Sequence, residues 1–176
     1  MELFRVEGPW PGRLAVCSRP RAGTWLDDDI AALRDANLDM LVSALTPEEI
    51  TRLGIEDVPA RCRAHHVEFI HFPVGNLQVP RADLAVAAFA RWLAALGEGR
   101  GLAVHCFASV GRAPTLVAAL LVMGGVPAAE AWRRIEAVRG RQVPDTNEQH
   151  DWVFKFAPAA RARPHGACNF SFRGEQ

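Results

Sequence analysis

The 176-residue sequence lacks the features that mark several classes of protein, and each absence limits what it can do. Its 20 basic residues balance 20 acidic ones, so charge gives no reason to expect nucleic acid or an acidic membrane surface as a partner. No apolar run reaches the ~18 residues that a membrane span needs. The first residues also lack the basic region and apolar core of a secretory signal. We therefore expect a globular protein that stays inside the cell.

Tyrosine is absent and cysteine is scarce. The four cysteines stand at positions 17, 62, 106 and 168, and neither they nor the histidines at 65, 66 and 71 have the spacing of a metal site. We expect no metal and no cofactor. The lack of tyrosine, together with many alanine and arginine residues, indicates only a GC-rich genome and so a bacterial source.

Patterns typical of strands and helices alternate along the chain. This alternation predicts an α/β fold with a mostly parallel central sheet of about four to five strands and helices on both faces. We expect one domain over residues 1–157 and a C-terminal extension over 158–176. The longest helix, over residues 80–96, should bury an apolar stripe of Leu84, Ala88, Trp92 and Ala95. The predicted strands cover residues 3–6, 13–16, 39–45, 67–72 and 102–105, and the predicted helices cover 26–36, 47–54, 58–65, 80–96, 113–124, 127–139 and 146–156.

One segment has the pattern of an anion-binding catalytic loop. An apolar strand leads to Cys106, five residues separate it from Arg112, and a helix follows. Backbone N–H groups and the positive helix end can then surround a phosphate dianion, while the guanidinium holds two phosphate oxygens. The same field favours the nucleophilic thiolate form of Cys106. The alternative is a buried structural cysteine with an unrelated arginine nearby. The full segment reads Val104-His105-Cys106-Phe107-Ala108-Ser109-Val110-Gly111-Arg112-Ala113-Pro114-Thr115.

This segment resembles the signature loop of the cysteine-dependent protein tyrosine phosphatases, above all the dual-specificity branch and its small bacterial relatives. Ala113-Pro114 after the arginine is also similar to the phosphatases of regenerating liver. Residues 71–80 resemble the family's general-acid loop, and residues 139–149 resemble its late loop before the last helix. The resemblance applies to residues 37–157 and more loosely to the rest. It implies a dual-specificity phosphatase-like fold and a role for His105 in tuning the thiolate through local hydrogen bonds. The other reading of His105, which is compatible, is a core histidine bonded to a backbone carbonyl.

Two residues depart from the family pattern near the cysteine. Ser109 occupies a position that is usually glycine, so it either keeps a negative φ or accepts strain, and its hydroxyl could add a hydrogen bond. Ala113 replaces the serine or threonine whose hydroxyl, in many relatives, helps the thiolate leave. The resemblance implies that Ala113 slows turnover without abolishing it.

The general acid is the third departure. In the family an Asp protonates the leaving oxygen, but the matching position here is Asn76, whose amide cannot deliver a proton. Asp83 is the nearest carboxylate in sequence, and we favour a helix-start role for it. Asp145, in the late loop, is a candidate for a catalytic or water-positioning role. Gln149 resembles a water-orienting residue, but it also fills the last position of a helix capping box that starts at Thr146.

We therefore expect hydrolysis of phosphomonoesters through a phosphocysteine intermediate, with protein phosphotyrosine as the first candidate and dual specificity as the second. The expected partner is a phosphoprotein or a small phosphomonoester, and the oligomeric state is left open. Because a thiolate needs a reducing compartment, we expect a cytoplasmic protein. A phosphoinositide is less favoured, since Phe107, Ala108 and Val110 carry no charge. The alternatives are a non-catalytic phosphoprotein-binding pseudophosphatase, suggested by Asn76 and Ser109, and a sulfur-transfer or arsenate-reducing enzyme.

Overall fold

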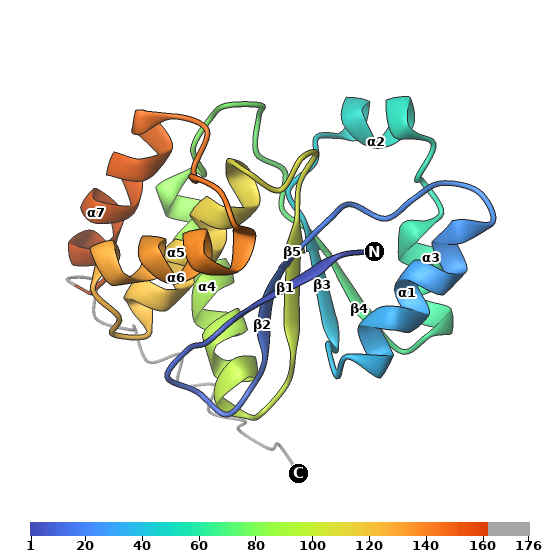
Figure 1. Ribbon diagram of the computed structural model, residues 1–176, viewed down its shortest axis with the longest axis horizontal. Helices are drawn as coiled ribbons and strands as arrows, with labels where there is room; N and C mark the ends of the chain where they lie inside the picture. Colours follow the sequence, from blue (N-terminus) through green and yellow to red (C-terminus); the bar gives the residue numbers. More distant parts are fainter. Residues whose placement is uncertain (162–176) are drawn as a thin grey trace, which may run out of the picture.

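The computed structural model describes residues 1–161, with side chains described to residue 156. A five-stranded sheet forms its centre, in the order β1-β2-β5-β3-β4 (Figure 1). The edge strand β1 (Leu3–Val6) runs antiparallel to β2 (Leu14–Cys17). The strands β2, β5 (Leu102–His105), β3 (Met40–Ser43) and β4 (Glu68–His71) are parallel to one another. The predicted mostly parallel sheet, with the 102–105 strand at its centre, is confirmed.

Helices cover both faces of this sheet, as predicted (Figure 1). The helices α1 (Trp25–Asp35) and α3 (Val58–Ala64) pack on one face, and α4 (Ala82–Gly97), α5 (Arg112–Met123), α6 (Ala128–Arg139) and α7 (Asn147–Arg161) lie on the other. Successive side chains of a strand point to opposite faces, so β5 places Leu102 and Val104 in the core under α4–α7 and Ala103 in the core under α1 and α3.

The short helix α2 (Pro47–Leu53) is fixed at both ends by local sequence. The hydroxyl of Thr46 accepts a hydrogen bond from the N–H of Glu49 (3.3 Å), and the Glu49 carboxylate accepts one from the N–H of Thr46 (2.9 Å). Gly54 ends the helix in the left-handed region, at φ 63°. This capping box was predicted, and it holds Glu49 at the end of the sheet where β3 stops.

The expected apolar stripe of α4 is partly wrong. Leu84 is 54% exposed, and the buried face consists of Ala85, Phe89, Trp92, Ala95 and Leu96. Phe89 sets this rotation, because its ring packs 5.1 Å from Trp92 and 5.5 Å from Phe156 of α7. Large aromatic rings bury more apolar area than a leucine, so they decide which face of a helix turns inward.

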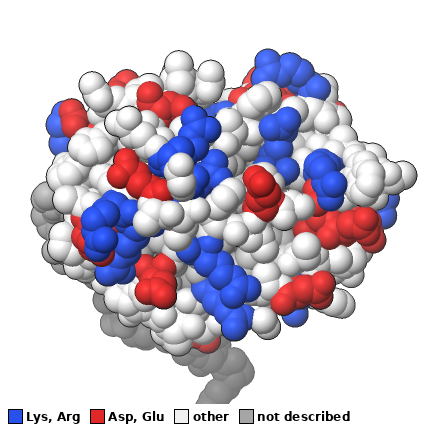
Figure 2. Space-filling view, in the orientation of Figure 1, with Lys and Arg blue, Asp and Glu red and all other residues white. Residues whose placement is uncertain are grey.

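The last helix, α7, continues to Arg161, further than the predicted end at about Phe156. It passes through the expected boundary between residues 157 and 158, and the remainder of the predicted extension, with Cys168, lies outside the described residues. Within residues 1–161, no helix has both the length and the apolar character to cross a bilayer. Basic and acidic side chains are interspersed over the face shown in Figure 2, without a continuous region of one sign.

Candidate active site

The segment predicted to bind phosphate lies at the carboxyl end of the central strand. Strand β5 ends at His105, Cys106 follows, and α5 begins at Arg112, so residues 106–112 form a loop between strand and helix (the signature loop). Every residue of α5 from Arg112 to Val122 is buried, which fixes the helix under the loop. Cys106 itself is 3% exposed. Ligands of parallel α/β sheets bind at this edge, so the predicted loop lies where such a fold binds its ligands.

Ser109 accepts a left-handed backbone conformation, with φ 56°. This is the strained alternative of the two that the sequence left open, because L-residues other than glycine rarely adopt positive φ. The hydroxyl of Ser109 donates a hydrogen bond to the carbonyl of Cys17 at the end of β2. This bond ties the middle of the signature loop to the neighbouring strand and offsets the strain.

The carbonyl oxygens of the signature loop are held from outside the loop. The ring Nδ1 of His105 lies 3.4 Å from the carbonyl of Cys106, and Arg19 donates to the carbonyl of Phe107 (2.8 Å). The carbonyl of Gly111 accepts from both the backbone N–H and the hydroxyl of Thr115, each at 3.0 Å. In a trans peptide the C=O of one residue and the N–H of the next point in opposite directions. A loop carbonyl that binds a partner outside the loop therefore turns the N–H of the following residue towards the inside of the loop.

Arg112 is buried and held by four hydrogen bonds. Its Nη1 and Nη2 donate to the two oxygens of Glu49 (2.6 and 2.8 Å), and Nη1 also reaches the carbonyls of Ala44 (3.3 Å) and Val74 (2.9 Å). Burial acts to lower the pKa of Arg112, but the Glu49 hydrogen bond and the nearby Cys106 sulfur outweigh it and raise the pKa. Likewise the Arg112 hydrogen bond lowers the pKa of Glu49. The guanidinium therefore stays charged and in place beside Cys106.

Sequence reasoning missed Glu49, because its place in the capping box already explained it. A signal was present: the box follows a buried strand, and parallel strands end at the same edge of the sheet. A carboxylate that caps a helix there can also reach Arg112, which begins the helix after the neighbouring strand β5.

The 71–80 loop borders the signature loop. The carbonyl of Val74 accepts from Arg112, and the carbonyl of Gln78 accepts from the side chain of Gln149 (3.1 Å). Asn76 lies between these two anchored residues and is exposed. The structure thus brings the loop of Asn76 to the site.

Asp145 and Gln149 lie against Gly111 of the signature loop. A Cβ atom added to Gly111 would stand 2.3 Å from Asp145 Oδ2 and 2.8 Å from Gln149 Oε1, so only glycine fits between them and the loop. Gln149 is fully buried, and its Oε1 has no hydrogen-bond partner among the described residues. The hydroxyl of Thr146 accepts from the Gln149 N–H (3.2 Å), but the Gln149 side chain turns to the 71–80 loop and completes only half of the capping box.

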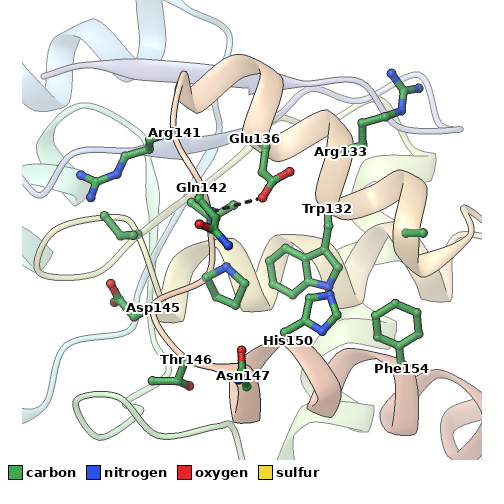
Figure 3. A pocket seen from close by; sticks show the side chains of 14 residues that line it. Trp132, Arg133, Glu136, Arg141, Gln142, Asp145, Thr146, Asn147, His150 and Phe154 are labelled. Atoms are coloured by element: carbon green, nitrogen blue, oxygen red, sulfur yellow. Dashed lines mark hydrogen bonds between the residues drawn. The ribbon is translucent and has the colours of Figure 1, made fainter.

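A cavity of about 730 Å³ opens beside Asp145 (Figure 3). Val110 of the signature loop lines it, together with residues of α6, α7 and the segment between them. Figure 3 shows Arg141 and Asp145 on one side of this cavity, and the side chains of Trp132, His150 and Phe154 on the other. The cavity is therefore continuous with the signature loop on the side of Asp145.

Two further residues considered from the sequence, Asp83 and His105, make contacts that explain them structurally. Asp83 is exposed in the first turn of α4, where its hydrogen bond from Arg81 lowers its pKa. Burial lowers the pKa of His105 to about 4, so its ring is neutral near pH 7 and can serve as a hydrogen-bonding core residue. Across residues 1–156 no cluster of histidine, cysteine and acidic side chains could hold a metal ion.

Comparisons with known proteins agree with this geometry. The sequence profile of the family described as "PTP-SAK: Swiss Army Knife protein, DSP-PTPase phosphatase domain" matches residues 7–164. The protein tyrosine phosphatase PRL-1 of Trypanosoma cruzi (strain CL Brener) is 44% identical over 70 residues, which are 39% of this chain and 38% of that relative. The alignment thus covers little more than a third of that relative's length.

Solved phosphatase structures share the fold. Kinase associated phosphatase, with its catalytic cysteine replaced by serine, matches with a TM-score of 0.84 at 14% identity over 93% of this chain and 97% of the other. PTPMT1 matches with a TM-score of 0.74 at 19% identity over 92% and 97%. Because the family profile spans nearly the whole described chain and includes both Cys106 and Arg112, the protein belongs to the DSP-PTPase phosphatase domains of the Swiss Army Knife family, within the cysteine-based phosphatases.

Proposed function

We propose that the protein hydrolyses phosphomonoesters through a phosphocysteine intermediate on Cys106, with protein phosphotyrosine as the first candidate substrate and dual specificity as the second. The observation that carries this proposal is the arrangement of Arg112. Its guanidinium is held by Glu49 and Val74 next to the Cys106 sulfur, at the start of a buried helix. A phosphate between Cys106 and Arg112 would meet the guanidinium, the positive end of α5 and the loop N–H groups.

In the first step the Cys106 sulfur attacks phosphorus, and the bond to the leaving oxygen breaks as that oxygen takes up a proton. In the second step water attacks the phosphocysteine, phosphate leaves, and the thiolate is restored. Arg112 and the loop N–H groups stabilise the charge on the phosphate oxygens in both steps. The methyl side chain of Ala113 offers no hydroxyl to the departing thiolate, so the second step should be slow.

We propose Asp145 as the group that exchanges protons with the leaving oxygen and with water. Its carboxylate packs against Gly111 and lines the cavity that can hold the organic part of a substrate. Asn76 can orient a leaving oxygen by a hydrogen bond but cannot protonate it. Gln149, with an unpartnered oxygen beside the same glycine, is suited to orient the attacking water.

Three measurements test this function. With a chelator present, wild-type protein should hydrolyse p-nitrophenyl phosphate, and Cys106→Ser should not, while it still binds vanadate. Asp145→Asn should lose about 10²-fold in kcat on phenyl phosphate, a poor leaving group, and much less on p-nitrophenyl phosphate. The matched control is Asp83→Asn, which removes an exposed carboxylate already bonded to Arg81.

The outcomes separate the candidate functions. Hydrolysis that persists in Cys106→Ser would refute the nucleophile. Tight binding of a phosphotyrosine peptide by the wild-type protein without any turnover would instead identify a pseudophosphatase. Equal losses in Asp145→Asn on both aryl phosphates would exclude Asp145 as the proton donor. Comparison of phosphotyrosine, phosphoserine and phosphothreonine peptides then defines the specificity.

A further inference from the structure

Two arginines from outside the signature loop converge on Phe107, the residue after the nucleophile. The guanidinium carbon of Arg19, from the segment after β2, lies 4.6 Å from the centre of the Phe107 ring. That of Arg52, from the last turn of α2, lies 5.3 Å from the same ring. The loop itself carries no cation at this position, so neighbouring segments supply the positive charge that the loop sequence lacks.

Neither arginine forms an ion pair within the described part of the chain. Glu49 of α2 interacts electrostatically with Arg52, but both of its carboxylate oxygens bind Arg112. Many other arginines form ion pairs, whereas Arg19 and Arg52 place two guanidiniums without an ion pair over a single ring. Ion pairs involve Arg21, Arg34, Arg61, Arg81, Arg91, Arg100, Arg133 and Arg134.

A cavity adjoins Arg19 and the end of α2, and Leu53, the residue after Arg52, belongs to its wall. It has a volume of about 450 Å³ and is lined by Ser18, Arg19, Arg21 and Leu53, among others. Arg21 is bonded to Asp29, so Arg19 supplies the uncompensated charge of its wall. Arg19 also donates to the carbonyl of Phe107, which fixes its guanidinium beside the signature loop. A preorganised guanidinium on a cavity wall is suited to planar, two-pronged recognition of phosphate.

We propose that Arg19 and Arg52 form a second anion-binding site beside the phosphate site, and that the substrate is a small phosphomonoester with a second phosphate group. This inference rests on the proposed phosphomonoester hydrolysis at Cys106, and for the substrate it favours a small phosphomonoester over the phosphotyrosine protein named above. Two unpaired guanidiniums match the charge of a phosphate dianion better than that of a single carboxylate. Because Phe107 directly follows Cys106, the two phosphates must lie close together on one small scaffold. Such a substrate can be a free polyol bisphosphate or the headgroup of a lipid.

The test compares ligands that differ only in the second phosphate. Calorimetry on the Cys106→Ser protein should show glucose 1,6-bisphosphate binding about tenfold more tightly than glucose 6-phosphate, because a charge-assisted Arg–phosphate contact has that magnitude. Arg52→Ala should remove this preference, and Arg52→Lys should restore part of it. Arg63→Ala is the control, because Arg63 is exposed on the neighbouring helix α3 and has no ion pair within the described residues. The preference should shrink as salt is added.

The two sources of the substrate are separated with the wild-type enzyme. The rate of phosphate release from free glucose 1,6-bisphosphate is compared with the rate from phosphatidylcholine vesicles that carry a phosphatidylinositol monophosphate. Both rates are also measured with the Arg52→Ala variant. Equal affinity for mono- and bisphosphate, or equal losses for both in Arg52→Ala, would overturn the second site. A preference confined to phosphotyrosine peptides with acidic neighbours would also overturn it. Selective binding of the bisphosphate without turnover of any ester would keep the second site and refute the proposed function.

Discussion

Replacement of Ser109 tests how the signature loop keeps its shape. Two opposing effects meet at this residue: a positive φ of 56°, which disfavours any side chain, and a buried hydroxyl that bonds to the carbonyl of Cys17. Ser109→Ala keeps the strain and loses the bond. Loss of a buried hydrogen bond costs about 1–3 kcal/mol, so the alanine variant should be destabilised by that amount.

Ser109→Gly also loses the bond but removes the strain. A residue with a Cβ in the left-handed region destabilises the fold by about 1–2 kcal/mol, and glycine removes this cost. The greater conformational freedom of glycine in the unfolded chain lowers the stability again by about 0.5–1 kcal/mol. The glycine variant should therefore be more stable than the alanine variant by roughly 1 kcal/mol. Its stability should lie about 0–2 kcal/mol below that of the wild type, because the lost bond costs about 1–3 kcal/mol and the released strain recovers roughly 1 kcal/mol.

Urea unfolding of the three proteins measures these differences, and vanadate affinity reports whether the loop still presents its N–H groups. We expect vanadate to bind the alanine variant most weakly, because its loop has strain without an anchor. An alanine variant as stable as wild type would show that the bond to Cys17 contributes nothing. A glycine variant less stable than the alanine variant would refute the strain argument.

Three further predictions concern the surroundings of the loop. In the Asp145→Asn background, which lacks the proposed proton donor, Asn76→Asp should raise kcat on phenyl phosphate by less than about 10²-fold and leave p-nitrophenyl phosphate nearly unchanged, because only the poor leaving group needs a proton. Steady-state kinetics in which neither rate changes would show that position 76 does not face the leaving oxygen. Glu49→Gln removes the negative charge that pairs with buried Arg112, so it should lower the free energy of unfolding by up to about 3 kcal/mol. It should also raise KM for aryl phosphates, and an unchanged KM would refute the role of Glu49 in positioning Arg112. His105 has a pKa of about 4 in the fold against an ordinary value of 6.5, so the unfolded chain binds the extra proton. Stability should be complete above pH 6.5 and fall by up to about 3 kcal/mol as pH drops towards 4, a dependence that unfolding curves should not show in His105→Gln.

Much of the fold could be predicted because its signals are local. Short apolar runs bounded by turn residues predicted all five strands, and Thr46, Glu49 and Gly54 defined α2 from start to end. The rotation of α4 could not be predicted in the same way. Leu84 and Phe89 both fit a helical stripe, and only the packing of Phe89 against Trp92 and Phe156 decides which of them is buried.

The candidate site also combines features that are local in the sequence with contacts between distant segments. The spacing of Cys106 and Arg112 between a strand and a helix predicted a phosphate loop, since that geometry depends on only seven consecutive residues. The partners of the loop come from distant segments. Glu49 is 63 residues from Arg112, and Arg19 is 88 residues from Phe107, so spacing along the sequence does not by itself pair these residues.

The sequence by itself determined the α/β fold, and it predicted Cys106 as the nucleophile, Arg112 as the phosphate-binding group and the loss of an acid at Asn76, because each of these site predictions depends on one short segment. Only the tertiary structure decided what surrounds the loop. The parallel strands β2, β3 and β5 end at one edge of the sheet, and the segments that follow them bring Arg19, Glu49 and Cys106 together there. Charge and specificity at this site therefore depend on strand order, a property of the folded sheet.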